Sequence, residues 1–244
     1  IETWQTLESE LGEITYSVEI LHDINRILSD IFNTGISIYS GAYIMHSGKT
    51  AFHQKRKHSN HLLLIKRMMS DGLLEKVKTA RSMCQIYDIL IDYPTIGSFL
   101  AYQYTIDINY SNITGFSEND FVVPGPGAID GLSKVFSNPA GLSPVDLIKL
   151  VCDRQELEFE RLGLAFQTLW GRHLQLIDCQ NLFCEISKYS RVSHPQIEGV
   201  AKRTRIKQKF TANSKPFEIF YPPKWRINAK ANNYIKKNER DNTQ

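Results

Sequence analysis

The sequence contains few cysteines, and none of the four forms a Cys-x-x-Cys pair. A disulfide framework or a zinc knuckle is therefore not expected, and reduced thiols in an intracellular protein are favoured. His53, His58 and His61 lie close together, but the neighbouring lysine and arginine side chains would repel a cation. Because no cysteine or paired carboxylate completes a ligand set near them, we predict no metal site and no cofactor.

Long hydrophobic runs are also missing. No stretch reaches the roughly 18 apolar residues that mark a membrane-spanning helix, and the first residues lack the basic and apolar parts of a secretion signal. We therefore expect no membrane partner and an intracellular location, nuclear in a eukaryote and cytoplasmic in a bacterium or for a phage protein. The first residue is Ile1 rather than methionine, which suggests that further sequence precedes it.

Two further absences concern function and fold. No GxxxxGK[ST] loop occurs, so the chain is not expected to be an NTP-hydrolysing kinase itself. No internal repeat and no sustained strand-like alternation occur, whereas several segments place apolar residues three and four positions apart, which is helical spacing. We therefore predict an all-α fold, with helices over residues 16–32, 36–45, 59–71, 73–91, 98–106, 143–170 and 178–189.

Positive charge gathers at the C-terminal end. Residues 201–244 hold 12 Lys and Arg against 3 acidic residues, while the whole chain carries only +3. Such asymmetry suits a protein that approaches a polyanion in one direction. We predict a helical domain over residues 1–200 and a basic, irregular strap and tail over 201–244, with Lys202, Arg203 and Arg205 as DNA-binding residues. Residues 216–225 are expected to be extended, and the last 15 residues read equally well as a solvated tail.

The stretch over residues 93–134 organises the prediction. A tight turn joins two helices in a hairpin over residues 82–107, and its backbone N–H groups can hold a DNA phosphate. Thr95, Gly97 and Ser98 are therefore predicted to bind DNA, although an ordinary αα-hairpin would have the same pattern. A small-residue hairpin followed some twenty residues later by an aspartate is the layout of helix-hairpin-helix DNA glycosylases.

Carboxylates and glycines follow the hairpin. Asp107 and Asp120 are candidate catalytic residues, because a carboxylate that faces a flipped nucleotide can act as a base or stabilise a sugar cation. Either could instead cap a helix. Gly125 and Gly127 precede a helix and can expose N–H donors to an anion, or they can simply form a rigid loop.

A polar triad marks the helix predicted over residues 178–189. Asn181, Glu185 and Lys188 are spaced i, i+4, i+7 and so share one helix face. The three side chains could line a pocket, or they could form an ion-paired surface.

Six segments in register resemble one family. They are IETW at residue 1, IYSGAYI at 38, YPTIGSFLAYQ at 93, DINY at 107, GPG at 125 and QNLFCEISKY at 180. This pattern, over roughly residues 1–226, resembles the α-glutamyl/putrescinyl thymine pyrophosphorylases, a family of DNA base-hypermodification enzymes. The same helical module accompanies 5-hydroxymethyluracil DNA kinases.

The resemblance implies a helix-hairpin-helix glycosylase-like fold and a transferase that acts on flipped-out, phosphorylated 5-hydroxymethyluracil in DNA. An amine from an amino acid or a polyamine would displace phosphate or pyrophosphate, after a 5-hydroxymethyluracil DNA kinase has acted. It implies Asp120, Asp107 and Glu185 as bases and Lys188 beside the leaving group. The implied substrate-binding residues are Tyr39, Tyr43, Tyr102, Gln103, Gly125, Gly127, Asn181 and Tyr189.

Two alternatives stay open. One is a monofunctional DNA glycosylase that excises a modified thymine or uracil, because the second hairpin helix has no lysine for a Schiff base. The other is a non-catalytic helical module that binds DNA or a protein partner.

Overall fold

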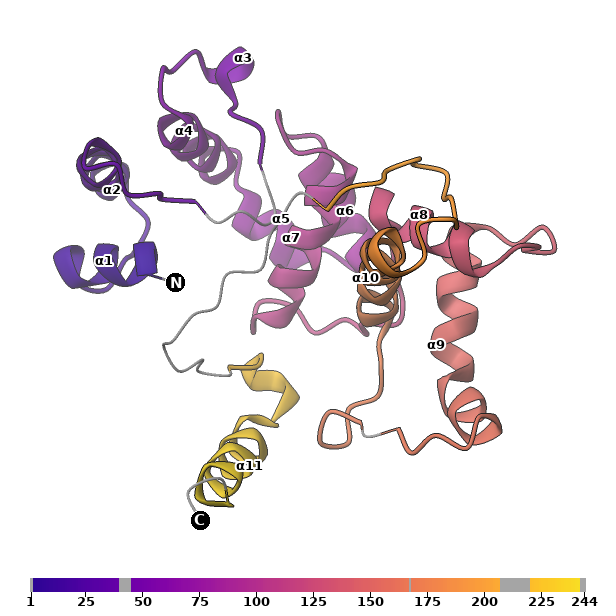
Figure 1. The fold of residues 1–244 in the computed structure, drawn as a ribbon. Helices are drawn as coiled ribbons and strands as arrows, with labels where there is room; N and C mark the ends of the chain where they lie inside the picture. Colours follow the sequence, from indigo (N-terminus) through magenta and orange to yellow (C-terminus); the bar gives the residue numbers. More distant parts are fainter. Residues whose placement is uncertain (1, 40–44, 167, 207–219, 242–244) are drawn as a thin grey trace. The chain divides into compact units, whose positions relative to one another are not determined.

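The computed structural model describes residues 2–39, 45–166, 168–206 and 220–241, with residues 235–241 given by their backbone alone. These residues form eleven α-helices and one 3-10 turn, and they contain no β-strand beyond an isolated Leu169–Arg172 bridge (Figure 1). The predicted all-α fold is confirmed. Among the described helices, none is both long and apolar enough to cross a membrane.

The chain divides into two compact units. Unit 1 comprises residues 1–81 and 85–101, and unit 2 comprises residues 82–84 and 102–244. The domain division that we predicted at residue 200 stays a prediction.

Unit 1 is built on helices α1 (Glu2–Leu11), α2 (Val18–Asn33), α3 (Lys49–Phe52), α4 (Lys57–Ser70) and α5 (Leu73–Thr79). Ser17 caps α2 by accepting a hydrogen bond from the Ile20 N–H at 3.0 Å. Leu7 of α1 and Ile24 and Ile27 of α2 form a buried cluster, so the apolar stripe predicted for residues 16–32 does face a core.

Two predictions in unit 1 are wrong in detail. Ile36–Tyr39 is not helical, and residues 40–44 of that predicted helix lie outside the described residues. The single helix predicted over residues 73–91 is two helices, because α5 ends at Thr79 and α6 (Met83–Ile91) begins after a break. The Arg81 N–H donates to the Gln85 side-chain oxygen at 2.8 Å, which stabilises a fresh helix start at this point.

Unit 2 contains α8 (Pro126–Val135), α9 (Pro144–Arg161), α10 (Leu176–Ser193), the 3-10 turn η1 (Pro223–Trp225) and α11 (Asn228–Asp241). Helix α7 (Ser98–Tyr110) begins in unit 1 and continues into unit 2. Helix α9 starts as predicted, since Ser143 and Asp146 form a reciprocal capping box before Pro144.

Helix α9 ends nine residues earlier than we predicted. Gly163 adopts a left-handed φ of 66°, its N–H donates to the Glu160 carbonyl, and the Leu164 N–H donates to the Phe159 carbonyl. This pattern is a Schellman motif, in which a left-handed glycine satisfies the last carbonyls and stops the helix.

Helices α8 and α10 lie side by side (Figure 1). Two glycines on α8, one turn apart, permit this closeness. A Cβ atom on Gly131 would clash with the Phe183 carbonyl, and one on Gly127 would lie 2.6 Å from the Cys184 sulfur. Phe183 itself is buried in the interface, so glycine is required here by packing between two backbones.

The C-terminal segment is more ordered than predicted. Residues 207–219 lie outside the described residues, but η1 and α11 replace the expected extended strap end and solvated tail. Trp225 donates from its indole nitrogen to Glu118 at 2.8 Å, and the Arg172 guanidinium lies 3.9 Å from the Trp225 ring centroid. Ile227 and Ala231 are buried, so apolar anchors hold this basic segment on unit 2.

Candidate functional site

The hairpin turn in unit 1 combines a buried inner side with an exposed outer edge. Tyr93 and Ile96 are buried, whereas Gly97 and Ser98 are exposed at the start of α7. Thr95 adopts a left-handed φ of 73°, which is strained for a β-branched residue. The predicted DNA-binding positions Gly97 and Ser98 are therefore accessible, and the Ser98 hydroxyl accepts from the Tyr87 hydroxyl at 3.0 Å.

Tyr39 belongs to a histidine network in unit 1. His61 Nε2 donates to the His46 carbonyl at 2.7 Å, so its Nδ1 accepts from the Tyr39 hydroxyl at 2.8 Å. Burial lowers the pKa of His61, which keeps the ring neutral. Tyr43 lies outside the described residues. Within those residues, no group of three or more His, Cys, Asp or Glu side chains could hold a metal ion.

Tyr102 and Gln103, two predicted substrate-binding residues, point into the protein. Tyr102 is fully buried and packs edge-on against Phe121, and Gln103 is 9% exposed. The Tyr102 hydroxyl and the Gln103 amide nitrogen have no hydrogen-bond partner among the described residues. Burial raises the pKa of Tyr102 well above its ordinary value, so this hydroxyl stays protonated.

The two candidate catalytic aspartates lie on unit 2. Asp107 is exposed near the end of α7, and desolvation by the surrounding protein raises the pKa of its carboxyl above the ordinary value. Asp120 is exposed on the loop that leads to α8. Its neighbour Glu118, which sequence reasoning passed over, pairs with Arg172 at 2.7 Å. Asp107 thus combines exposure with a raised pKa.

The predicted glycine donors serve the packing of α8 against α10. The Gly125 N–H donates to the Gln180 side-chain oxygen at 3.1 Å, and this bond is buried. Gly127 packs against Cys184. A close helix contact thus accounts for these glycines, and their role toward an anion stays a prediction.

The outer face of α10 carries the predicted polar triad. Asn181 and Glu185 are exposed, Lys188 is half-buried, and Lys188 pairs with Glu185 at 2.6 Å. Tyr189 is 61% exposed and contacts His194 edge-on. The structure therefore brings the triad onto one surface, in the ion-paired arrangement that was the open alternative.

The inner face of α10 holds a charged network that sequence reasoning missed. Ser187 donates to Asp130 Oδ2 at 2.6 Å, and Lys134 Nζ and Arg191 Nη2 lie 3.3 Å and 3.6 Å from the same oxygen. The Ala201 N–H donates to Asp130 Oδ1 at 2.8 Å. A signal existed, because Asp130 and Lys134 on α8, like Ser187 and Arg191 on α10, are spaced i, i+4.

These bonds also set the charge state of Asp130. Burial alone would raise its pKa, but the bonds from Ser187, the Ala201 N–H and Lys134 outweigh burial and lower it below the ordinary value. Asp130 is therefore ionised, and its negative charge lies between two cationic side chains.

A small cavity opens beside this network. We call it the basic pit; its volume is about 50 Å³, and the lining side chains that matter chemically are Lys134, Arg191, Glu198, Lys202, Arg203 and Thr204. Gly199 crosses directly over Asp130, where a Cβ atom would clash with the carboxylate. Lys202 then turns the chain with a left-handed φ of 48°. The predicted DNA-binding residues Lys202 and Arg203 thus join buried cations on α8 and α10.

Arg205, the third predicted DNA-binding residue of this segment, follows the pit. Its side chain is exposed, and its carbonyl accepts from Arg191 Nη1 at 3.3 Å.

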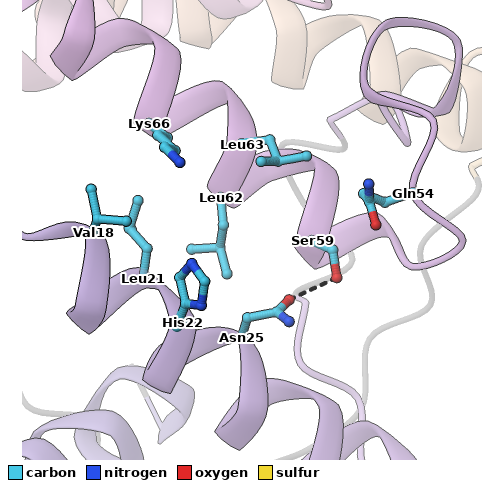
Figure 2. A pocket seen from close by; sticks show the side chains of 9 residues that line it. All are labelled: Val18, Leu21, His22, Asn25, Gln54, Ser59, Leu62, Leu63 and Lys66. Carbon is cyan, nitrogen blue, oxygen red and sulfur yellow. Dashed lines mark hydrogen bonds between the residues drawn. The ribbon is translucent and has the colours of Figure 1, made fainter.

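A second cavity lies in unit 1, between α2 and α4, and has a volume of about 250 Å³. Figure 2 shows its mixed lining, with His22 and Asn25 on α2 and Lys66 on α4. The Ser59 hydroxyl donates to Asn25 Oδ1 at 2.7 Å across this cavity. It gathers no excess of charge comparable with that of the basic pit.

The described residues thus define an all-helical protein with a cation-rich pit at the end of its α8–α10 pair. Residues 1–199 match the family described as the helical domain of 5-hmdU DNA kinase, and the chain belongs to this family.

Among curated proteins, the 5-hmdU DNA kinase of Bacillus phage SP10 is 26% identical over 170 residues, which is 64% of this chain. The match spans 27% of that kinase, so the chain corresponds to about a quarter of its length. No solved structure shows a significant match.

Proposed function

We propose that this chain handles DNA during the enzymatic modification of 5-hydroxymethyluracil. Its membership of the kinase helical-domain family supports this role. The 244 residues contain no GxxxxGK[ST] loop, so we propose for this chain the holding of DNA rather than the nucleotide-binding step of a kinase.

The observation that carries the proposal is the gathering of cationic side chains around one pit in unit 2. Lysine and arginine clusters supply most of the affinity of a protein for the phosphates of DNA. The exposed Gly97 and Ser98 at the start of α7 offer a second phosphate contact, and the strained Thr95 is consistent with a turn held for binding.

We further propose that the chain acts on the phosphorylated base by amine transfer. The amine nitrogen forms a bond to the exocyclic carbon of the base, the bond from that carbon to the phosphate oxygen breaks, and phosphate leaves with the electron pair. The proton of the amine passes to a carboxylate. Asp107 is the best candidate for this base, because its raised pKa brings it closer to the pH at which a base works efficiently.

The test uses three DNA duplexes that are identical except for one thymine, 5-hydroxymethyluracil or phosphorylated 5-hydroxymethyluracil. Each is incubated with the chain and an amine, then digested to nucleosides and weighed by mass spectrometry. We expect an amine-bearing thymidine only from the phosphorylated DNA. Free base with abasic sites would replace this proposal by a glycosylase, and bound but unchanged DNA would reduce it to a binding module.

An Asp107→Asn variant tests the proposed base. It should lose amine transfer while DNA binding is kept, because the amide cannot accept the proton. Asp153→Asn, at another exposed aspartate on α9, is the control. Equal activity of the two variants would remove Asp107 from the mechanism.

A further inference from the structure

The basic pit buries more positive than negative charge. The side chains of Lys134 and Arg191 are only 4% and 9% exposed, and both share the single buried carboxylate of Asp130, which is 1% exposed. A buried charge without a counter-charge is strongly unfavourable. The two buried cations therefore lack one counter-charge among the described protein groups, and an anion in the pit would supply it.

The donors of the two buried cations are unequally used. Lys134 Nζ reaches Asp130, the Ser187 carbonyl at 3.3 Å and the Ser190 hydroxyl at 3.1 Å, which accounts for its three donors. Arg191 donates from Nη2 to Ser187 and from Nη1 to the Arg205 carbonyl. Its Nε is buried and has no hydrogen-bond partner among the described residues. Arg191 therefore retains donor capacity next to the cavity that it lines.

The size of the pit limits what can enter. A cavity of about 50 Å³ holds roughly three to five atoms of the size of a water oxygen, because one water molecule needs about 10–15 Å³ of cavity volume. A nucleobase or a sugar is too large. The oxygen atoms of one phosphate group fit this space.

The charge of the pit favours a terminal phosphate over a backbone phosphate. Lys134, Arg191, Lys202 and Arg203 face the carboxylates of Glu198 and Asp130, which leaves two positive charges. A terminal phosphate carries about −1.5 to −2 at neutral pH and neutralises this excess. A backbone diester carries a single charge and continues on both sides, so it fits a pit of this size less well.

We infer that the basic pit binds a terminal phosphate group, either free or carried on the hydroxymethyl group of phosphorylated 5-hydroxymethyluracil in DNA. Only the base-linked form rests on the proposed function, since free phosphate needs no DNA. Arg191 and Lys134 form the floor of this site, and Lys202 and Arg203 form its rim.

The first arm of the test titrates inorganic phosphate into the whole chain and follows thermal unfolding. Phosphate should raise the melting temperature. A chloride salt at the same ionic strength, with no sulfate in the buffer, should not. The second arm measures the affinity for the three duplexes described above. The phosphorylated duplex should bind roughly tenfold more tightly than the duplex with 5-hydroxymethyluracil, as expected for one new charge-assisted contact.

Rim variants report on the pit without disturbing its floor. Arg203→Gln should reduce the preference for the phosphorylated duplex, whereas Glu198→Gln should increase it, because both residues are exposed and their charges are opposite. Lys149→Gln, an exposed lysine on α9, makes the same charge change outside the pit and should leave the preference unaltered. Arg191→Lys would probe the floor, but the rim variants decide the matter if it fails to fold.

Each combination of results has one meaning. A phosphate effect that depends on Glu198 and Arg203, without a preference among duplexes, makes the ligand a free phosphate. A preference for the phosphorylated duplex without an effect of free phosphate makes it the base-linked group. If neither appears, the inference is overturned. If the phosphorylated duplex is preferred without an effect of free phosphate, an Arg203→Gln variant that weakens all three duplexes equally also overturns the inference. Loss of binding to every duplex would instead contradict the proposed function and leave the first arm to judge the pit.

Discussion

Helix α10 carries two polar faces that look alike in the sequence and differ in the structure. The outer face places Glu185 and Lys188 in an ion pair that solvent reaches. The inner face places Ser187 and Arg191 against Asp130 and Lys134 of α8, where these side chains are largely buried from solvent. Both faces follow helical spacing, so spacing alone identifies which residues share a face and not which face is enclosed.

The comparison shows that the effect of a charged side chain on stability depends on whether the side chain is buried. An exposed ion pair contributes about 0–1 kcal/mol because water already solvates both partners. Breaking a buried pair leaves a charge with neither partner nor water, which is far more unfavourable. The inner face should therefore dominate stability, and it is also the face on which the cation-rich pit opens.

The largest expected effect comes from Asp130→Asn. The substitution keeps the shape but leaves Lys134 and Arg191 without their buried counter-charge, so we expect a loss of about 3–5 kcal/mol of unfolding free energy. Urea unfolding followed by circular dichroism measures it. A loss below about 1 kcal/mol would contradict the expectation that the inner face of α10 contributes more to stability than the outer face.

Acid should remove most of the difference in stability between the wild type and Asp130→Asn. Because the folded-state pKa of Asp130 is lowered, its contribution is fully present above its unfolded value of about 3.9. The contribution is lost as the pH falls through the lower folded value. The gap in stability between the wild type and Asp130→Asn should be constant from pH 8 to pH 5 and shrink in acid. A gap that widens in acid would contradict the assignment.

A substitution of Gly131 tests the contact that brings the inner face together. Gly131→Ala drives a Cβ atom into the Phe183 carbonyl, and overpacking of this kind costs about 1–3 kcal/mol. Gly115→Ala is the matched control, because nothing lies within 4 Å of its added Cβ atom. Equal melting temperatures for the two variants would mean that α8 and α10 tolerate a wider separation.

The loss from a neutral, partly buried contact in unit 1 should fall between the losses on the two faces of α10. Tyr39→Phe removes the hydroxyl that donates to His61 Nδ1 and leaves a buried acceptor unsatisfied, at a loss of about 1 kcal/mol. Thermal unfolding together with the His61 ring signals in NMR would check this. An unchanged His61 signal would show that Tyr39 does not hold the ring.

The smallest expected effect is that of Glu185→Gln on the outer face. Its ion pair with Lys188 is exposed, so the change in unfolding free energy should stay within about 0.5 kcal/mol. The same urea titration measures it beside Asp130→Asn. If Glu185→Gln instead abolished amine transfer at unchanged stability, the result would support the catalytic role that the sequence predicts for Glu185.

Much of the fold could be predicted from local patterns. The stripe of α2, the capping box of α9 and the existence of α10 are signals carried by neighbouring residues. The early end of α9 is also set by a local residue, Gly163. The sequence does not distinguish a glycine that will adopt a left-handed conformation and end a helix from any other glycine. Helix α11 escaped prediction because its own composition is polar, and its anchors Ile227 and Ala231 gain their stability from burial against other segments.

The sequence by itself determined the helical class, the concentration of positive charge after residue 200 and the residues that share each helix face. Those properties depend on composition and on the period of the helix, which neighbouring residues settle among themselves. Only the tertiary structure decided that Gly127 and Gly131 serve helix packing, that Asp130 is enclosed, and that Lys202 and Arg203 meet Lys134 and Arg191 around one pit. Burial and long-range approach set those outcomes, because a charge is stabilised or penalised by the groups that surround it in space, and no spacing along the chain records them.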